Sequence, residues 1–152
     1  MRVDTVSIEH ALPPDAHLIS VLSRDLIESG LNWSWKAARV AQRIRSSSSL
    51  VVVARDHEKV VGFVILRLLN DCVRLDLLAV INEYQRQGIG RRLVECVEES
   101  ALMNGKTIVH LELRETNSSA GYFYRSLGYV DFIRIPGYYQ QQESALRMYH
   151  LL

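Results

Sequence analysis

Two β-branched runs, at residues 50–55 and 60–69, stand on either side of a short polar turn at residues 56–58. Valine and isoleucine suit the pleated surface of a sheet, so this stretch predicts a β-hairpin. A further strand is expected at residues 73–80, and from residue 88 onward helical spacing of apolar residues alternates with strand patterns. The predicted order is a run of strands followed by strand, helix, strand, helix and strand. This order predicts an α/β fold with a mixed sheet and helices on both faces.

Capping residues and apolar spacing predict the other elements. Pro13 and Pro14 suit the first turn of a helix that Gly30 ends, and Ser34 is the predicted N-cap of a second helix. The remaining expected elements are strands at residues 3–8, 107–113, 129–133 and 145–151, and helices at residues 88–104 and 117–127.

The composition is that of an ordinary folded protein, with 48% hydrophobic and 23% charged residues, and the length predicts one domain over residues 1–152. Because 18 basic residues face 17 acidic ones, no broad positive field is expected to bind nucleic acid or an anionic membrane. The longest apolar stretches are too short to cross a bilayer. Two cysteines without paired spacing predict a reduced, cytoplasmic protein, and the five histidines lack the spacing of a metal site.

Two glycines, Gly88 and Gly90, stand where a loop enters a predicted helix. Glycine lets the backbone approach a ligand closely, and the free N–H groups of a helix's first turn bind anions. Arg86, Arg91 and Arg92 add positive charge, so this loop is predicted to bind a diphosphate. A Rossmann fingerprint fits poorly, because its third glycine is missing and seven residues separate the strand from the loop. A Walker loop is excluded because no Gly-Lys-Ser/Thr follows.

The loop QRQGIG, at residues 85–90, resembles the Q/R-x-x-G-x-G/A signature of the GNAT superfamily of acetyl-CoA-dependent N-acetyltransferases. Two later blocks, LELRETN at residues 111–117 and YFYRSLGY at residues 122–129, resemble the strand and helix that follow it in the family. The resemblance implies a single-domain GNAT fold, with a mixed, mostly antiparallel sheet of about six to seven strands and about four helices. It also implies acetyl-CoA as the co-substrate.

The family motifs can be placed on this sequence residue by residue. By the resemblance, the backbone of Leu78, Ala79 and Val80 binds the pantetheine arm as an added strand. Asn117 contacts the same arm, and Tyr124 lies near its sulfur. The pyrophosphate is implied to contact the loop residues Arg86, Gln87, Gly88, Ile89, Gly90 and Arg91.

Within the superfamily, these blocks and the segment PGYY at residues 136–139 resemble the enzymes that acetylate the N-terminal alanine of a ribosomal protein. This implies Glu112 as the general base, directly or through water, and Tyr124 as the general acid for the departing thiolate. Tyr138 and Tyr139 are implied to line the groove for a protein or peptide N-terminal α-amino group. Two alternatives stay open: a small-amine acceptor (polyamine, amino acid or aminoglycoside), and a non-catalytic regulatory domain that binds acetyl-CoA.

The chemistry of the acceptor favours an α-amino group. Deprotonating one at pH 7 costs on the order of 1 kcal/mol, against about 5 kcal/mol for a lysine, and a carboxylate is a modest base. Each candidate residue also has a structural alternative: pairing with an arginine for Glu112, a helix cap for Asn117, the edge of the core for Tyr124, and cover of the sheet for Tyr138 and Tyr139. The oligomeric state, including a homodimer, is open.

Overall fold

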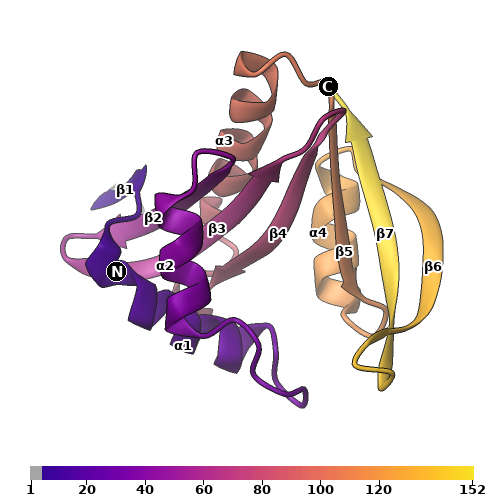
Figure 1. The fold of residues 1–152 in the computed structure, drawn as a ribbon, viewed down its shortest axis with the longest axis horizontal. Coiled ribbons are helices and arrows are strands. Elements are labelled where there is room, and N and C mark those ends of the chain that lie inside the picture. The colour runs from indigo at the N-terminus through magenta and orange to yellow at the C-terminus, as the bar shows by residue number, and fades with distance from the viewer. Residues whose placement is uncertain (1–4) are drawn as a thin grey trace.

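The computed structural model describes residues 5–152, which are arranged around one seven-stranded sheet (Figure 1). The strand order is β1-β2-β3-β4-β5-β7-β6, and every neighbouring pair is antiparallel except β4 and β5. The strands are β1 (Val6–His10), β2 (Ser49–Asp56), β3 (Lys59–Leu68), β4 (Val73–Val80), β5 (Ile108–Arg114), β6 (Val130–Tyr139) and β7 (Glu143–Leu151).

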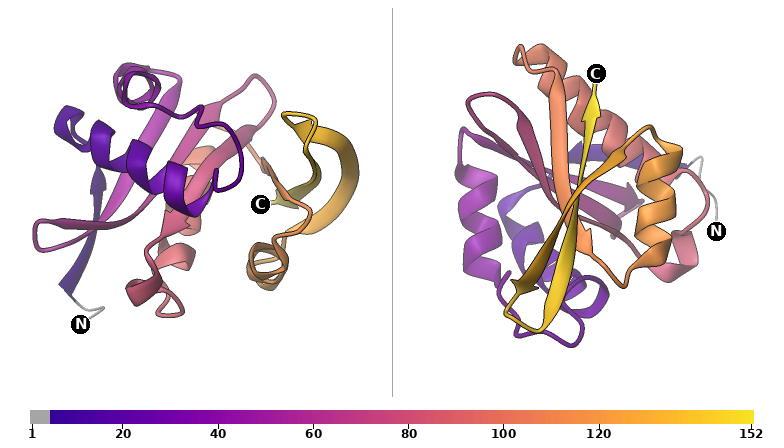
Figure 2. Two further views of the ribbon diagram at one scale, coloured as in Figure 1. Left: turned by 90° about the horizontal axis from the view of Figure 1, so that it is seen from below. Right: turned by 90° about the vertical axis from the view of Figure 1, so that its right-hand side faces the viewer.

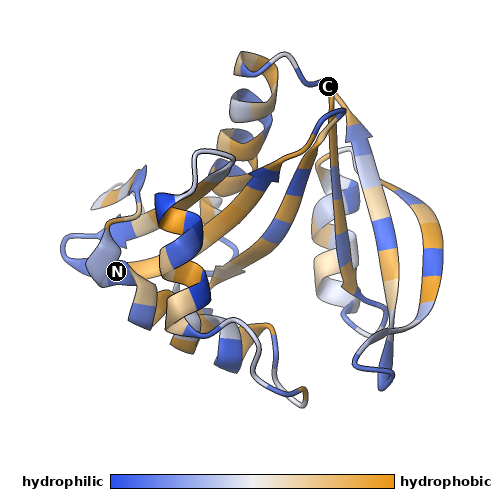
Figure 3. Ribbon diagram, viewed as in Figure 1, coloured by the Kyte–Doolittle hydropathy of each residue, from blue (hydrophilic) through white to orange (hydrophobic). Residues whose placement is uncertain are grey.

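Four α-helices cover the two faces of the sheet (Figure 2). The helices α1 (Ala16–Leu26) and α2 (Ala37–Arg45) pack on one face, where Ile19 and Val40 are completely buried. The helices α3 (Ile89–Met103) and α4 (Ser118–Ser126) pack on the other. Because both faces are covered, β3 is apolar along nearly its whole length, whereas polar and apolar residues alternate along β7 (Figure 3). Two 3-10 turns, η2 (Pro13–Asp15) and η3 (Asn82–Tyr84), precede α1 and α3.

The sheet divides between β4 and β5. These parallel strands pair only from Val73 to Leu75, opposite residues 109–111. At that point Asp76 forms a β-bulge, since Leu75 and Leu77 face consecutive residues of β3. A bulge bends its strand, and beyond it β4 and β5 diverge (Figure 1). The edge of β4 from Leu77 to Val80 is therefore left without a partner strand among the described residues.

The structure confirms the predicted α/β fold, with seven strands and four α-helices in a mostly antiparallel sheet. The hairpin is present, and the strand at Val73–Val80 has the predicted bounds. The predicted strand at residues 3–8 is observed at Val6–His10, with residues 3 and 4 outside the described part of the chain. The strand predicted at residues 129–133 continues to Tyr139.

Two helix ends were predicted wrongly. The first helix ends at Leu26, before Gly30. Ser34 does not cap the second helix, whose N-cap is Lys36. The reason is Glu28, which is only 6% exposed and accepts hydrogen bonds from the backbone N–H and the hydroxyl of Ser34, each at 2.7 Å. A buried carboxylate needs such donors, and the hydrogen bonds from Ser34 to Glu28 hold this part of the chain out of the helix.

In the described part of the chain, no helix has the length and apolarity needed to cross a membrane.

Candidate active site

The glycine loop ends in the first turn of α3. Gly88 is the N-cap residue and has a left-handed backbone conformation, with φ at +87°, that other residues rarely adopt. The first bond within the helix runs from the Arg92 N–H to the Gly88 carbonyl, so the preceding amides have no helical acceptor. Arg86 also has a positive φ, at +60°, which is uncommon outside glycine and is typical of functional loops. The loop therefore presents several N–H donors and the positive end of the helix dipole.

A cleft of about 810 Å³ opens in front of this loop. It lies where the free edge of β4 faces the start of α4, in the divergence of the sheet. The lining residues are Leu26, Leu78, Ala79, Val80, Asn82, Gln85, Arg86, Gly88, Gly90, Arg91, Asn117, Ser119, Ala120, Tyr122, Phe123 and Tyr124. The cleft thus collects nine of the eleven residues that the motifs place around acetyl-CoA, and its walls are partly apolar and partly rich in donors.

Two predicted cofactor residues, Gln87 and Ile89, do not line the cleft. The Ile89 side chain is 1% exposed and packs in the core, so only its backbone is available to a ligand. The cleft also includes residues that the motifs do not predict, namely Leu26 from α1 and several residues of α4. The amphipathic pattern of α4 predicted a helix there but could not show which face meets the cleft.

The free edge of β4 can accept an extended ligand. Alternate residues of a strand point their backbone groups to the same side, and the Val80 carbonyl points outward, accepting a hydrogen bond from Gln85 Nε2 at 2.8 Å. Leu78, two residues earlier, directs its N–H and C=O the same way. An unpaired strand edge of this kind binds an extended chain by main-chain hydrogen bonds.

Tyr124 stands at the cleft with an almost wholly buried ring, which is 6% exposed. Phe123 and Tyr129 contact it edge to face, with ring centroids 5.0 and 5.6 Å away. Burial, together with the nearby Tyr139, raises the pKa of Tyr124 well above its ordinary value. Its raised pKa keeps the hydroxyl protonated, and among the described residues none hydrogen-bonds it, so it can donate to a ligand.

Asn117 caps α4, because its side-chain oxygen accepts a hydrogen bond from the Ala120 N–H at 3.1 Å. The same residue lines the cleft, so the structural role expected for it does not exclude contact with a ligand.

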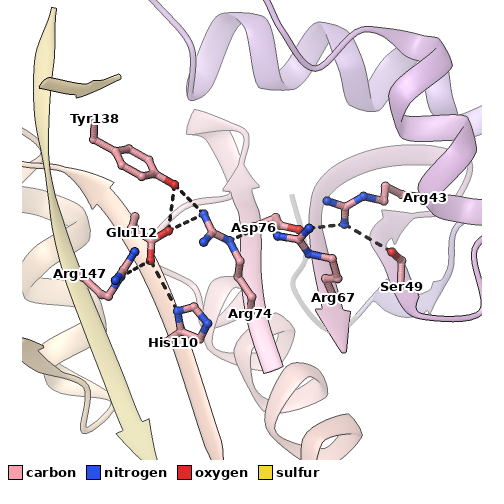
Figure 4. A network of polar contacts seen from close by, with 9 residues as sticks. All are labelled: Arg43, Ser49, Arg67, Arg74, Asp76, His110, Glu112, Tyr138 and Arg147. Atoms are coloured by element: carbon pink, nitrogen blue, oxygen red, sulfur yellow. Dashed lines mark hydrogen bonds and ion pairs between the residues drawn. The ribbon is translucent and has the colours of Figure 1, made fainter. Parts of the chain in front are cut away.

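Glu112 does not line the cleft. It belongs to a cluster of charged side chains, called the ion cluster below, on the side of the sheet that α1 and α2 cover (Figure 4). Its side chain is 2% exposed. The carboxylate accepts hydrogen bonds from the Tyr138 hydroxyl and from Arg147 Nε, each at 3.0 Å, and forms an ion pair with Arg74. On the other side of Arg74, its Nε donates to Asp76 at 2.8 Å, and Asp76 in turn pairs with Arg43 at 2.8 Å. One guanidinium therefore links two buried carboxylates.

The surroundings of Glu112 make it a weak base in the free protein. Burial alone would raise its pKa, but His110, Arg74, Arg147 and Tyr138 outweigh burial and hold the pKa at about 2. The structural alternative considered for Glu112, pairing with an arginine, is thus realised. Its predicted role as general base remains a prediction.

Two tyrosines of β6, Tyr138 and Tyr139, lie next to the ion cluster. Tyr138 bonds both Glu112 and Arg74 Nη2, the latter at 2.7 Å, and its ring is 4.9 Å from that of Tyr139. Burial raises the pKa of Tyr139, with smaller contributions from Tyr138 and Glu112, which indicates that these groups are near neighbours. Tyr138 therefore belongs to the ion cluster, and Tyr139 packs against it.

The next residue along, Gln140, joins the β6–β7 turn to the loop between α1 and α2. Its side-chain amide donates to the Asn32 carbonyl at 2.9 Å and accepts from the Asn32 N–H at 2.8 Å. This pair of bonds connects the two loops beyond the ends of β4 and β5.

Among residues 5–152, no group of three or more His, Cys, Asp or Glu side chains is placed to share a metal ion.

Comparisons with known proteins agree with this geometry. Residues 47–131 match the family model described as Acetyltransferase (GNAT) domain. The ribosomal protein bS18-alanine N-acetyltransferase of Escherichia coli strain K12 is 35% identical over 81 residues, 53% of this chain and 55% of the relative. The chain thus spans about half the length of the curated relatives it matches.

Solved structures are similar over almost the whole chain. Ard1 from Thermoplasma volcanium superposes with a TM-score of 0.85 at 23% identity, covering 97% of this chain and 98% of that one. Arabidopsis thaliana NAA60 in complex with acetyl-CoA has a TM-score of 0.81 at 16% identity, covering 97% and 99%. At these identities the likeness concerns the fold.

Proposed function

The chain belongs to the GNAT acetyltransferase family, as its motifs predict, and from this premise we propose that it acetylates protein N-termini. In this proposal, residues 1–152 form a single domain that moves the acetyl group of acetyl-CoA directly to an α-amino group within a ternary complex. The cleft at the glycine loop holds the co-substrate, and the acceptor enters from the side of Tyr138 and Tyr139. A relative whose name states that it acetylates the alanine of a ribosomal protein supports this acceptor class.

The residues of the cleft suit acetyl-CoA. The amides before Arg92 and the side chains of Arg86 and Arg91 face the pyrophosphate, and the outward backbone of Leu78 and Val80 bonds the pantetheine arm. Acetyl-CoA supplies a thioester, whose carbonyl carbon is open to attack by a neutral amine. Asn117, at the start of α4, contacts the arm.

Tyr124 has the properties of the general acid. Its ring is fixed by packing, its hydroxyl stays protonated because its pKa is raised, and it lines the cleft. As the amine nitrogen bonds the carbonyl carbon and the carbon–sulfur bond breaks, negative charge develops on sulfur. A phenol positioned there donates its proton to the leaving sulfur.

The observation that carries the choice of acceptor is the pairing of carboxylates near the acceptor side. Glu112 pairs with Arg74 and Arg147, and Glu143 and Glu115 pair with Arg114 and Arg134, respectively. An acidic pocket would favour polyamines or aminoglycosides, which carry several positive charges. Because each of these carboxylates faces a guanidinium, the site is better matched to the single amine of a peptide N-terminus.

Three acids of the described N-terminal part of the chain, Glu9, Asp15 and Glu28, also have partners within the protein. Asp15 and Glu9 pair with Arg55 at 2.9 and 3.2 Å, and Glu28 is buried against the backbone of the α1–α2 loop. These acids support the local structure instead of facing an acceptor.

A peptide panel tests the proposal. Free thiol release from acetyl-CoA is measured with free-amine peptides, with the same peptides blocked at the N-terminus and carrying an internal lysine, and with spermidine. We expect turnover of the first set alone. Equal rates on both peptide types, or activity with spermidine alone, would contradict the proposed acceptor. Binding of acetyl-CoA without turnover of any amine would favour a regulatory domain.

We propose a cytoplasmic location on the same grounds, since the named substrate of the bacterial relative is a ribosomal protein. Fractionation of cells that produce the protein would test this.

A further inference from the structure

Arg114 is the last residue of β5, and it contacts both walls of the cleft. One wall is the edge of β4 together with Leu26 at the end of α1, and the opposite wall is the start of α4. Arg114 lies three residues beyond Leu111, where the described pairing between β4 and β5 ends and the two strands diverge (Figure 1). Contacts other than strand pairing therefore hold the two walls at this end of the cleft.

The side chain of Arg114 binds the wall across the divergence. Its Nη1 donates hydrogen bonds to the carbonyls of Ile27 and Ser29, at 3.2 and 2.5 Å. Ile27 is the C-cap of α1, and Leu26, directly before it, lines the cleft. Carbonyl groups at the end of a helix lack helical partners and carry partial negative charge, so a guanidinium is a favourable partner for them. Arg114 thus fixes the end of α1.

The backbone of Arg114 binds the opposite wall. Its carbonyl accepts a hydrogen bond at 2.8 Å from the N–H of Asn117, which caps α4 and lines the cleft. The Glu143 carboxylate on β7 holds the guanidinium through an ion pair with Nη2, and it also accepts a hydrogen bond from the Thr116 hydroxyl at 3.0 Å. The side chains of Arg114 and Glu143 are each 22% exposed, so water only partly screens this pair. Arg114 therefore connects Leu26 on one wall with Asn117 on the other.

We propose that Arg114 is a positioning residue that sets the spacing of the cleft walls around the pantetheine arm of acetyl-CoA. This inference rests on the proposed function, in which this cleft holds acetyl-CoA and Asn117 contacts the arm. The glycine loop, which faces the pyrophosphate, has its own backbone conformation at the start of α3 and does not depend on Arg114. Walls that already have the right spacing bind the arm more tightly, because less of the free protein has to rearrange.

The first test compares acetyl-CoA with ribose-phosphorylated ADP, which is the nucleotide part of coenzyme A without the arm. Dissociation constants of both ligands are measured by calorimetry in wild type and in Arg114→Gln. A glutamine side chain is shorter and uncharged, so it cannot bond both carbonyls and pair with Glu143 at once. We expect the affinity for acetyl-CoA to fall about tenfold, and the affinity for the nucleotide to change by less than about twofold.

Two outcomes of this comparison would overturn the proposal. An equal loss for both ligands would show that Arg114 supports the fold in general, and no loss for either would show that the walls keep their spacing without it. If neither ligand bound to the wild type, the proposed function itself would be contradicted. Should Arg114→Gln fail to fold, Arg114→Lys takes its place, because a single ammonium keeps the charge but cannot bond both carbonyls and Glu143. The same selective loss is expected of it.

Arg134→Gln is the matched control. Arg134 is an arginine of β6 that also pairs with a carboxylate, Glu115, and it donates to the Ser144 hydroxyl at 3.1 Å. Both partners belong to the same half of the sheet as Arg134, so this arginine does not join the two walls. Its removal should leave both affinities near wild type. A selective loss of acetyl-CoA affinity as large as that of Arg114→Gln would show that the loss of any arginine at this end suffices, and would overturn the proposal.

The second test measures the spacing of the walls without any ligand. Nitroxide labels are attached to the exposed positions of Asp25→Cys on α1 and Ser126→Cys on α4, after Cys72 and Cys96 have been replaced by serine. Double electron–electron resonance then gives the distribution of distances between the labels. We expect Arg114→Gln to broaden this distribution, and acetyl-CoA to narrow it again because the ligand contacts both walls. A distribution that Arg114→Gln leaves unchanged would overturn the proposal, whatever the cleft binds.

Discussion

At the scale of single residues, Tyr124 shows how packing and chemistry combine at one position. Edge-to-face contacts with Phe123 and Tyr129 fix the ring, so the hydroxyl has a defined place at the cleft. The structural alternative considered for this residue, a tyrosine at the edge of the core, describes its ring. The role of general acid concerns its hydroxyl. The two descriptions apply to different atoms and can be separated by experiment.

Tyr124→Phe removes the hydroxyl and keeps the ring. We expect acetyl-CoA affinity and the midpoint of thermal unfolding to stay near wild type, and kcat to fall by roughly 100-fold, as for a lost general acid. Steady-state kinetics with a free-amine peptide, and thermal shifts with and without acetyl-CoA, provide the measurement. Full turnover in the variant would refute the acid role. Normal kcat with weakened acetyl-CoA binding would make Tyr124 a binding residue.

At the scale of elements, the start of α3 depends on backbone conformation more than on side chains. Gly88 has a φ of +87°, and a Cβ added there would meet nothing within 4 Å. A substitution therefore causes no steric clash within the protein, and its effect comes from the strained backbone and from the space that a ligand would occupy.

Gly88→Ala should reduce acetyl-CoA affinity at least tenfold, because the loop amides move from their places and a methyl group occupies the approach of the diphosphate. The loss of unfolding free energy should be about 1 kcal/mol. Gly105→Ala is the matched control. Gly105 has a φ of +73° and follows the far end of α3, and a Cβ added there also meets nothing within 4 Å. The stabilisation of each variant by acetyl-CoA in a thermal shift assay gives the comparison. Equal affinity losses in both would argue against the glycine loop as the binding site.

At the scale of the whole molecule, the ion cluster joins both halves of the divided sheet. Glu112 and Arg147 belong to the β5–β7 half, whereas Arg74 and Asp76 belong to β4, and Arg43 reaches Asp76 from α2. Polar side-chain contacts therefore join the two halves of the sheet at the place where backbone pairing between β4 and β5 is limited to three residue pairs. Breaking one partner of such a buried network is costly because the other charges are left unpaired.

The cluster predicts an acid-sensitive contribution to stability. The pKa of Glu112 is lowered from 4.5 to about 2 on folding, so its contribution is complete above about pH 4.5 and is lost as the pH falls toward 2. After allowance for solvent screening, this contribution is about 2 kcal/mol. Glu112→Gln should therefore be less stable than wild type in urea unfolding at pH 7, and the difference should shrink between pH 4.5 and 2.5. Glu58→Gln, in the exposed β2–β3 turn, is the control and should show no such trend. A difference that is constant across this range would contradict the lowered pKa.

Local sequence was sufficient for the features that depend on neighbouring residues. The β-branched runs determine the β2–β3 hairpin, the glycine loop determines the start of α3, and Asn117 caps α4 as its side chain predicts. The family motifs together name nine of the sixteen residues that line the cleft, because each motif covers residues a few positions apart in the chain. Periodicity and turn conformation act over such short distances, so a sequence expresses them directly.

The tertiary structure alone decided what depends on distant partners. Leu26 joins the cleft from a helix that precedes the glycine loop by some sixty residues, and Glu28 keeps Ser34 from capping α2. The low pKa of Glu112 depends on His110 of the same strand and also on groups on β4, β6 and β7 that contact it only after the sheet forms. Charge and burial at such a site are sums over neighbours from the whole fold, and no local pattern records them. For this reason the sequence motifs reach the residues of the cleft, whereas the electrostatic environment of Glu112 follows only from the tertiary structure.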